Sequence, residues 1–222
     1  MCEQCKCPIC GSDAWKKTDI SSASKFYTCP VCGRIEFQMN LNSNTDDVPF
    51  DKNYLAAFLA YNGYKTDLRF YTNKTKEWIN KVKEELNEGN KNRALPVYLD
   101  NETVENWYPK KFAEKIDYIL LYFGAHINHI GENLILKKEE LYSILFVDRF
   151  DYDQFDRPVK RGSGALKNQA DFMLDYLKDQ SYIKSPTTAN WWNVSGNEIS
   201  LQILPKCYER IDYLQRNNTH GK

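Results

Sequence analysis

The sequence predicts an α+β protein: a small cysteine-bound β unit, then a mainly helical region, then a short helix–strand–strand–helix unit. Three observations predict this fold class. The phrase Cys-Pro-x-Cys-Gly occurs twice, at 7–11 and 29–33. Apolar residues recur at helical spacing from residue 51 onward. Two β-rich stretches, 181–185 and 198–204, interrupt that pattern near the end. The predicted regions are 1–45, 46–157 and 158–222.

The repeated phrase supplies four thiolates with the spacing of a metal site. A Cys-x-x-Cys turn places two sulfurs on one side of a tight loop, and two such turns complete a tetrahedral shell. The Pro restricts the backbone, and the Gly permits a positive φ that turns backbone amides toward the sulfurs. The predicted ligands of one zinc ion are Cys7, Cys10, Cys29 and Cys32. Because four thiolates leave no position for water, we expect a structural zinc.

The segment between the two turns suits a small β hairpin. Eighteen residues separate Cys10 from Cys29, with strands predicted in AWKK and SKFYTC and a third in RIEFQMNL. This arrangement resembles the zinc ribbon, a family of small β folds held by zinc, over residues 1–40. We expect a unit with too little apolar surface to fold without its metal.

Two other interpretations of these cysteines are weaker. A disulfide framework is typical of secreted proteins, and we expect no signal segment here. A redox dithiol needs only one Cys-x-x-Cys. Cys2 and Cys5 offer a rival pair without the matching Pro and Gly, so their role stays open. Cys207 is predicted to pack within a helix.

Composition narrows the class of protein. The 30 basic and 30 acidic residues cancel, which argues against a general nucleic-acid coat. The mean hydropathy is −0.65 and no run of eighteen apolar residues occurs. We therefore expect a soluble, cytoplasmic protein with no membrane segment.

The central region is predicted to be helical. Helices are expected over 51–64, with Leu55, Phe58 and Leu59 on one face, and over 109–131, beginning at Pro109. A third helix, over 75–90, has an apolar stripe of Trp78, Ile79, Val82 and Leu86. Residues 92–109 are predicted to be an irregular connection with an extended piece at 97–99.

Two groups of polar residues in this region could form a metal or catalytic site. His126 and His129 form a His-x-x-His pair, but a helix-capping role is favoured because no further ligand is near in the sequence. The carboxylates of residues 148–156 lack the Gly and Glu of a calcium loop, so solvated turns are the better interpretation. These carboxylates are Asp148, Asp151, Asp153 and Asp156.

The C-terminal region has the layout of a winged helix. A helix over 165–180 is predicted to bury Phe172, Met173, Leu174 and Leu177. Two strands follow, around a polar and aromatic turn that would be the wing, and a last helix begins at Pro205.

The order of these parts resembles the N-terminal half of a group of bacterial proteins that begin with a zinc ribbon. In that group a ribbon and a winged helix sense or scaffold, and a C-terminal effector follows, often in an anti-phage setting. The effector is typically a TIR or nucleoside-deoxyribosyltransferase-like domain. Only seven residues follow Gln215, so we expect the effector on a separate polypeptide or in a longer protein.

The resemblance and the residues together predict a non-enzymatic module that binds a partner. Residues 158–222 carry nine basic and six acidic groups, a net charge of +3. The candidate contact residues are Lys160, Arg161, Lys184, Trp191 and Trp192, which could combine phosphate contact with base stacking. A protein partner is favoured over nucleic acid, because Asp171, Asp175 and Asp179 would repel phosphate from the helix before the wing. The sequence does not predict the oligomeric state.

Overall fold

The computed structural model describes residues 2–38, 50–63, 67–89, 94–185, 191–192 and 196–219. The chain divides into two compact units, Met1–Tyr108 and Pro109–Lys222. This division differs from the predicted boundaries at 45 and 157. The first of those boundaries would cut through a continuous sheet, and the second would separate the last helices from the strand and helices that they pack against.

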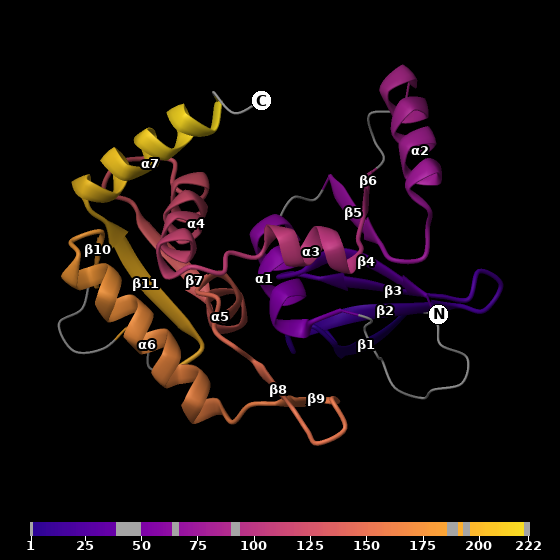
Figure 1. Ribbon diagram of the computed structural model, residues 1–222, viewed down its shortest axis with the longest axis horizontal. Helices are drawn as coiled ribbons and strands as arrows, with labels where there is room; N and C mark the ends of the chain where they lie inside the picture. The colour runs from indigo at the N-terminus through magenta and orange to yellow at the C-terminus, as the bar shows by residue number, and fades with distance from the viewer. Residues whose placement is uncertain are drawn as a thin grey trace. The chain divides into compact units, whose positions relative to one another are not determined.

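The first unit is built on one mixed sheet with the strand order β1-β2-β3-β4-β5-β6 (Figure 1). Its first four strands form an antiparallel meander, whereas β5 and β6 continue the sheet parallel to β4. The predicted ribbon therefore extends into the region that was expected to be helical. The strands are β1 Cys2–Lys6, β2 Asp13–Asp19, β3 Ser24–Cys29, β4 Gly33–Gln38, β5 Leu68–Tyr71 and β6 Leu95–Tyr98.

Three helices belong to this unit: α1 Lys52–Gly63, α2 Lys76–Gly89 and α3 Asn101–Trp107. The first two match the predicted helices. The third lies where an irregular connection was expected, and it begins because the Asp100 carboxylate accepts a hydrogen bond from the Thr103 amide, at 2.6 Å.

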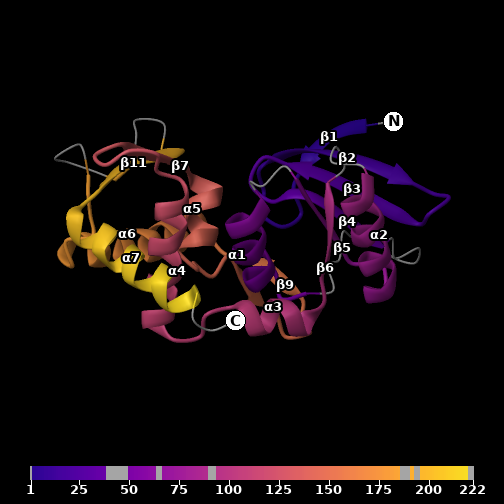
Figure 2. The same ribbon diagram turned by 90° about the horizontal axis from the view of Figure 1, so that it is seen from above.

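The helices α1 and α2 lie on opposite sides of the parallel strands (Figure 2). Phe58 of α1 contacts Phe70 edge-to-face, with ring centroids 5.9 Å apart. Trp78 of α2 contacts Tyr71, the next residue of the same strand, at 5.4 Å. Because successive side chains of a strand point to opposite faces, the two helices cover different faces. The Phe70 face forms the core together with buried Ile35 and Leu59.

The second unit combines helices with a three-stranded antiparallel sheet of order β10-β11-β7. Figure 2 shows this sheet on one side of α4, α6 and α7. A separate hairpin, β8 with β9, interrupts the path from α5 to α6. The elements are α4 Phe112–Ala125, β7 Asn133–Lys137, α5 Lys138–Ile144, β8 Phe150–Tyr152, β9 Pro158–Lys160, α6 Ser163–Asp179, β10 Ile183–Lys184, β11 Glu198–Ile203 and α7 Pro205–Thr219.

The buried stripe of α6 differs in one residue from the predicted one. Phe172 is 65% exposed, although it was expected to point inward. Buried side chains recur at positions 166, 170, 173, 174 and 177, and residue 172 lies on the opposite side of a helix with that stripe. The other three predicted residues, Met173, Leu174 and Leu177, are buried as expected.

Within the described part of the chain, no helix combines the length and the apolar character that a membrane crossing requires.

Candidate metal centre

Four cysteines from two turns meet at one end of the first sheet. Cys7 and Cys10 lie in the turn from β1 to β2, and Cys29 and Cys32 lie where β3 turns into β4. Their sulfur atoms are all within 4.8 Å of one another, and all four side chains are buried. The meander thus brings together two pairs that stand far apart in the sequence.

The donor set fits a metal ion. Thiolates at about 2.3 Å from a tetrahedral metal would lie about 3.8 Å from one another, which agrees with the observed cluster. Both glycines have the predicted left-handed backbone, with φ of 77° at Gly11 and 75° at Gly33. The amides of Val31 and Cys32 each donate to the Cys29 sulfur, at 3.4 Å. The second turn therefore already carries the amide-to-sulfur bonds that stabilise a thiolate.

The thiols of the cluster influence one another. Hydrogen bonds from Cys29, Cys32 and Cys7 lower the pKa of Cys10 well below its usual range. The hydrogen bond to Cys10, together with burial, raises the pKa of Cys32. Because the four thiols hold on to their protons unequally, binding of a metal ion by all four would release the remaining protons.

The other cysteines lie outside this centre. Cys2 is exposed on the edge strand β1, where its register partner is Lys17, and Cys5 lies opposite Ala14. Over the ranges that the structure describes, Cys7, Cys10, Cys29 and Cys32 are the one group found with three or more metal-ligating side chains in reach of an ion. Cys207 is fully buried in α7, as predicted, and burial raises its pKa to about 12.

The end of α1 supports the second turn of the centre. Gly63 lies directly against Cys32 and Gly33, so closely that a Cβ atom on either glycine would be 2.4 Å from backbone atoms of the other segment. Only residues without a side chain permit this approach.

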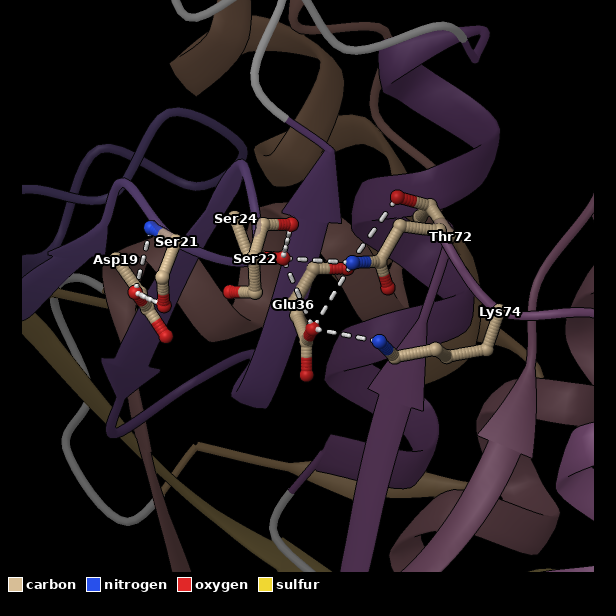
Figure 3. A network of polar contacts seen from close by, with 8 residues as sticks. Asp19, Ser21, Ser22, Ser24, Glu36, Thr72 and Lys74 are labelled. Carbon is tan, nitrogen blue, oxygen red and sulfur yellow. Dashed lines mark hydrogen bonds and ion pairs between the residues drawn. The ribbon is translucent and has the colours of Figure 1, made fainter.

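A second polar cluster surrounds Glu36, a buried carboxylate that the sequence did not single out (Figure 3). Its Oε1 atom accepts hydrogen bonds from the Asn73 amide at 2.9 Å and the Ser24 hydroxyl at 3.1 Å. Lys74 lies 3.9 Å from the same oxygen. The Glu36 carbonyl accepts from the Thr72 amide at 3.1 Å. The sequence spacing does not predict these contacts, because residues 72–74 are brought to Glu36 by the parallel pairing of β4 with β5.

The Glu36 cluster borders a cavity of about 450 Å³ at the carboxyl ends of β5 and β6. Residues 72–77 and Tyr98 line it. The lysines there are already engaged, since Lys76 lies 3.3 Å from Asp100 and Lys74 lies near Glu36. The contacts of Glu36 therefore join β4 to the loop after β5, which is a structural role.

The histidine pair is not assembled into a site. His126 follows α4, stacks on Tyr122 and forms a 2.8 Å hydrogen bond between its Nδ1 atom and the Tyr122 carbonyl. His129 is exposed. The position of His126, the C-cap of α4, agrees with the predicted role at a helix end, whereas His129 lies in the turn beyond it.

The aspartates of residues 148–156 belong to the β8–β9 hairpin and its connections. Asp153 accepts from the amides of Phe155 and Arg157, at 2.8 and 2.9 Å, and pairs with the Arg157 side chain. Asp151 pairs with Arg161. Asp151 and Asp153 thus stabilise turns and ion pairs within the hairpin.

The predicted contact residues are divided between elements. Lys160 ends β9 and Arg161 follows it, whereas Lys184 lies on β10 opposite Gln202. The two tryptophans instead bond to α6. Trp191 donates to Asp175 at 2.9 Å, and Trp192 donates to Asp171 at 2.8 Å. Both indoles can reach α6 because residue 191 forms a bend and residue 192 a single bridge with Ile199, so neither lies in a regular strand.

Comparisons with protein-family models, with curated proteins and with solved structures found no match to this chain.

Proposed function

We propose that this protein is a non-enzymatic recognition and scaffolding module, with a structural zinc ribbon in its first unit and a winged helix in its second. The winged helix contacts a protein partner. The observation that carries the proposal is the bonding of Trp191 and Trp192 to the aspartates of α6.

Zinc is the metal that the cysteine cluster suits best. A tetrahedral set of four sulfurs fits zinc or iron, and two Cys-x-x-Cys turns at the ends of a β meander are typical of structural zinc. A closed shell gives the metal no open position for substrate. Reduced thiolates also favour a cytoplasmic location.

The element order of the second unit supports a winged helix. A helix, a strand and two helices come first, and a β hairpin with β11 in the centre of the sheet follows. On this interpretation the motif spans 112–203 rather than beginning at 158, and α6 is the helix before the wing. One departure is the β8–β9 hairpin between α5 and α6, which replaces the short turn of a simple helix-turn-helix.

The surface of α6 favours protein over duplex DNA. The helix carries Lys167 and Lys178 against three aspartates, and Lys167 already pairs with Asp171. A helix with this balance repels the phosphates that flank a major groove. Phe172, 65% exposed on the same helix, is the kind of aromatic side chain that anchors a protein interface. We therefore expect a partner with basic groups and an apolar pocket.

The resemblance described above suggests the setting. In that group of bacterial proteins the ribbon and winged helix serve an effector domain, so the partner here is proposed to be an effector polypeptide of a defence system. Affinity capture from the native host with wild type, Phe172→Asp and Ile130→Asp tests this. Ile130, 88% exposed in the same unit, is the matched control.

The expected result is one partner retained by wild type and Ile130→Asp and lost with Phe172→Asp. Duplex DNA should bind none of the three proteins at physiological salt. Duplex binding that Phe172→Asp leaves intact and a Lys160→Ala, Arg161→Ala variant abolishes would contradict the proposal.

A further inference from the structure

The face of the first sheet that α2 covers at its parallel strands carries a row of side chains across its antiparallel strands. Direct register partners across the strands share one face, and here Gln4 lies opposite Trp15, Trp15 opposite Thr28, and Thr28 opposite Arg34. Arg69 continues the row on β5. The row crosses four strand spacings, about 19 Å in all.

A cavity of about 490 Å³ opens at this row. Its lining comes from the row, from the second cysteine turn and from the end of α1, and it includes one carboxylate, that of Asp13. The lining residues are Gln4, Asp13, Ala14, Trp15, Thr28, Cys29, Pro30, Gly33, Arg34 and Gly63. Its volume is within the range of small-ligand sites, and its wall combines one large aromatic ring with polar groups.

Trp15 is the most exposed of the five tryptophans, at 56%. Its exposed ring lines the cavity, and an aromatic side chain in a concave wall is typical of a ligand site. In the parts of the chain that the structure describes, it stacks on no other ring. Its indole face is therefore open to a planar group.

Three cations lie along the row, of which Arg69 already contacts the Tyr71 side chain. Lys17 follows Trp15 two residues later on the same strand and face, and over the described ranges neither Lys17 nor Arg34 has a carboxylate within ion-pair distance. Arg69 lies over the Phe26 ring, 6.0 Å from its centroid. The acidic groups of this face are largely occupied, because Asp13 pairs with Lys6 at 2.6 Å and Glu36 lies near Lys74. Asp19 lies at the far end of the hairpin, bonded to Ser21.

We infer that this face binds single-stranded nucleic acid, with a base stacked on Trp15 and the backbone phosphates on Lys17, Arg34 and Arg69. Aromatic rings interleaved with cations are the combination that single strands require, since an unpaired base offers its face and its phosphates offer charge. Gln4 and Thr28 add hydrogen-bonding groups beside the stacking ring. A duplex has no free base face and is a poorer match. The row is also longer than one nucleotide, which favours a strand over a free nucleotide.

This inference goes beyond the proposed protein contact of the second unit. It rests on other residues, so either can fail without the other. The test is fluorescence anisotropy of labelled oligothymidylate and oligouridylate with the zinc-loaded full chain at low and high salt. A hairpin duplex and a free nucleoside triphosphate serve as competitors. The variants are Trp15→Ala, Trp15→Phe and Arg34→Ala, and the matched controls are Ile20→Ala and Lys16→Ala on the same hairpin.

We expect Trp15→Ala to weaken single-strand binding at least about tenfold, and Trp15→Phe to retain most of it. Arg34→Ala should reduce the slope of log affinity against log salt by about 0.7. Both controls should bind like wild type, and zinc content should be equal in all variants.

Three results would overturn the inference. One is no single-strand binding at low salt by the zinc-loaded wild type. Another is equal binding by wild type, Trp15→Ala and Arg34→Ala. The last is a concentration-dependent dimer that Trp15→Ala abolishes, because the occupant of the face would then be a second copy of the chain.

Discussion

The backbone of Gly33 lies directly against the carbonyl group of Gly63: a Cβ atom added to Gly33 would be 2.4 Å from that oxygen. Gly33 closes the second cysteine turn, and Gly63 is the last residue of α1. The metal centre and the helix therefore share one tight backbone contact. Any side chain there would push the helix off the turn or distort the turn itself.

Gly33→Ala should lower the free energy of unfolding by more than about 2 kcal/mol, because Ala would adopt a positive φ as well as clash. Gly63→Ala should destabilise through the clash alone. Gly164→Ala, where an added Cβ meets nothing within 4 Å, is the control and should stay within about 1 kcal/mol of wild type. Urea unfolding of the three variants measures this. Equal stability of Gly63→Ala and wild type would show that the contact is not rigid.

One zinc ion per chain is expected, and the cysteine variants should separate ligands from bystanders. Cys29→Ser should lose the metal and lower the melting temperature, because a structural zinc contributes directly to folding. Cys2→Ser, on the edge strand, should retain both metal and stability. Elemental analysis measures the zinc content of each variant, and thermal unfolding measures its melting temperature. A Cys29→Ser protein with a full complement of zinc would contradict the ligand assignment.

The buried thiol of Cys207 should make stability depend on alkaline pH. Burial raises the pKa of Cys207 from 9.0 to about 12. Between pH 9 and pH 12 the thiol is therefore protonated in the folded protein and deprotonated in the unfolded chain. The unfolded state then binds fewer protons, and stability should fall as pH rises through that window, by up to about 1.4 kcal/mol per pH unit. Cys207→Ala should flatten this dependence, whereas Cys2→Ser should not. In native protein iodoacetamide should modify Cys2 and spare Cys207.

Arg210 and Asp117 join α7 to α4 through a forked pair. The Nε and Nη2 atoms of Arg210 donate to Asp117 over distances of 2.8–3.0 Å. Arg210→Lys keeps the charge and loses the fork, so we expect a loss of roughly 0.5–1 kcal/mol at this partly exposed site. A double-mutant cycle with Asp117→Asn measures the coupling. A coupling energy of zero would mean that the pair contributes nothing to the contact between the helices.

No hydrolase or transferase activity is expected of the isolated chain. The first side chain to test for an activity is Glu36, the buried carboxylate near Lys74. Incubation with nucleotides, NAD and DNA in the presence of divalent metal is the screen. Turnover that disappears in Glu36→Gln, His126→Ala or Asp148→Asn would overturn the expectation, provided the variant keeps its melting temperature.

The sequence by itself determined the features that depend on local spacing. Two Cys-Pro-x-Cys-Gly turns predicted the four sulfurs and both positive-φ glycines, because ligand geometry acts over four residues. Helical periodicity predicted α1, α2, α4, α6 and α7, because burial of one face recurs every three to four residues. Pro205 likewise marked the start of the last helix.

Only the tertiary structure decided which strands join which sheet. Parallel addition of β5 and β6 to β4 depends on long-range pairing that leaves no periodic signal in a four-residue strand. The sheet therefore continues past the boundary predicted at residue 45. The same pairing brings Asn73 to Glu36 and aligns Trp15 with Arg34 across the sheet. The sequence also shows the two tryptophans, but it does not show their partners. Asp171 and Asp175 lie one turn apart on α6, and Trp191 and Trp192 meet them only because the chain folds back onto that helix. Local geometry is encoded over a few residues, whereas these contacts arise only when the whole chain has packed.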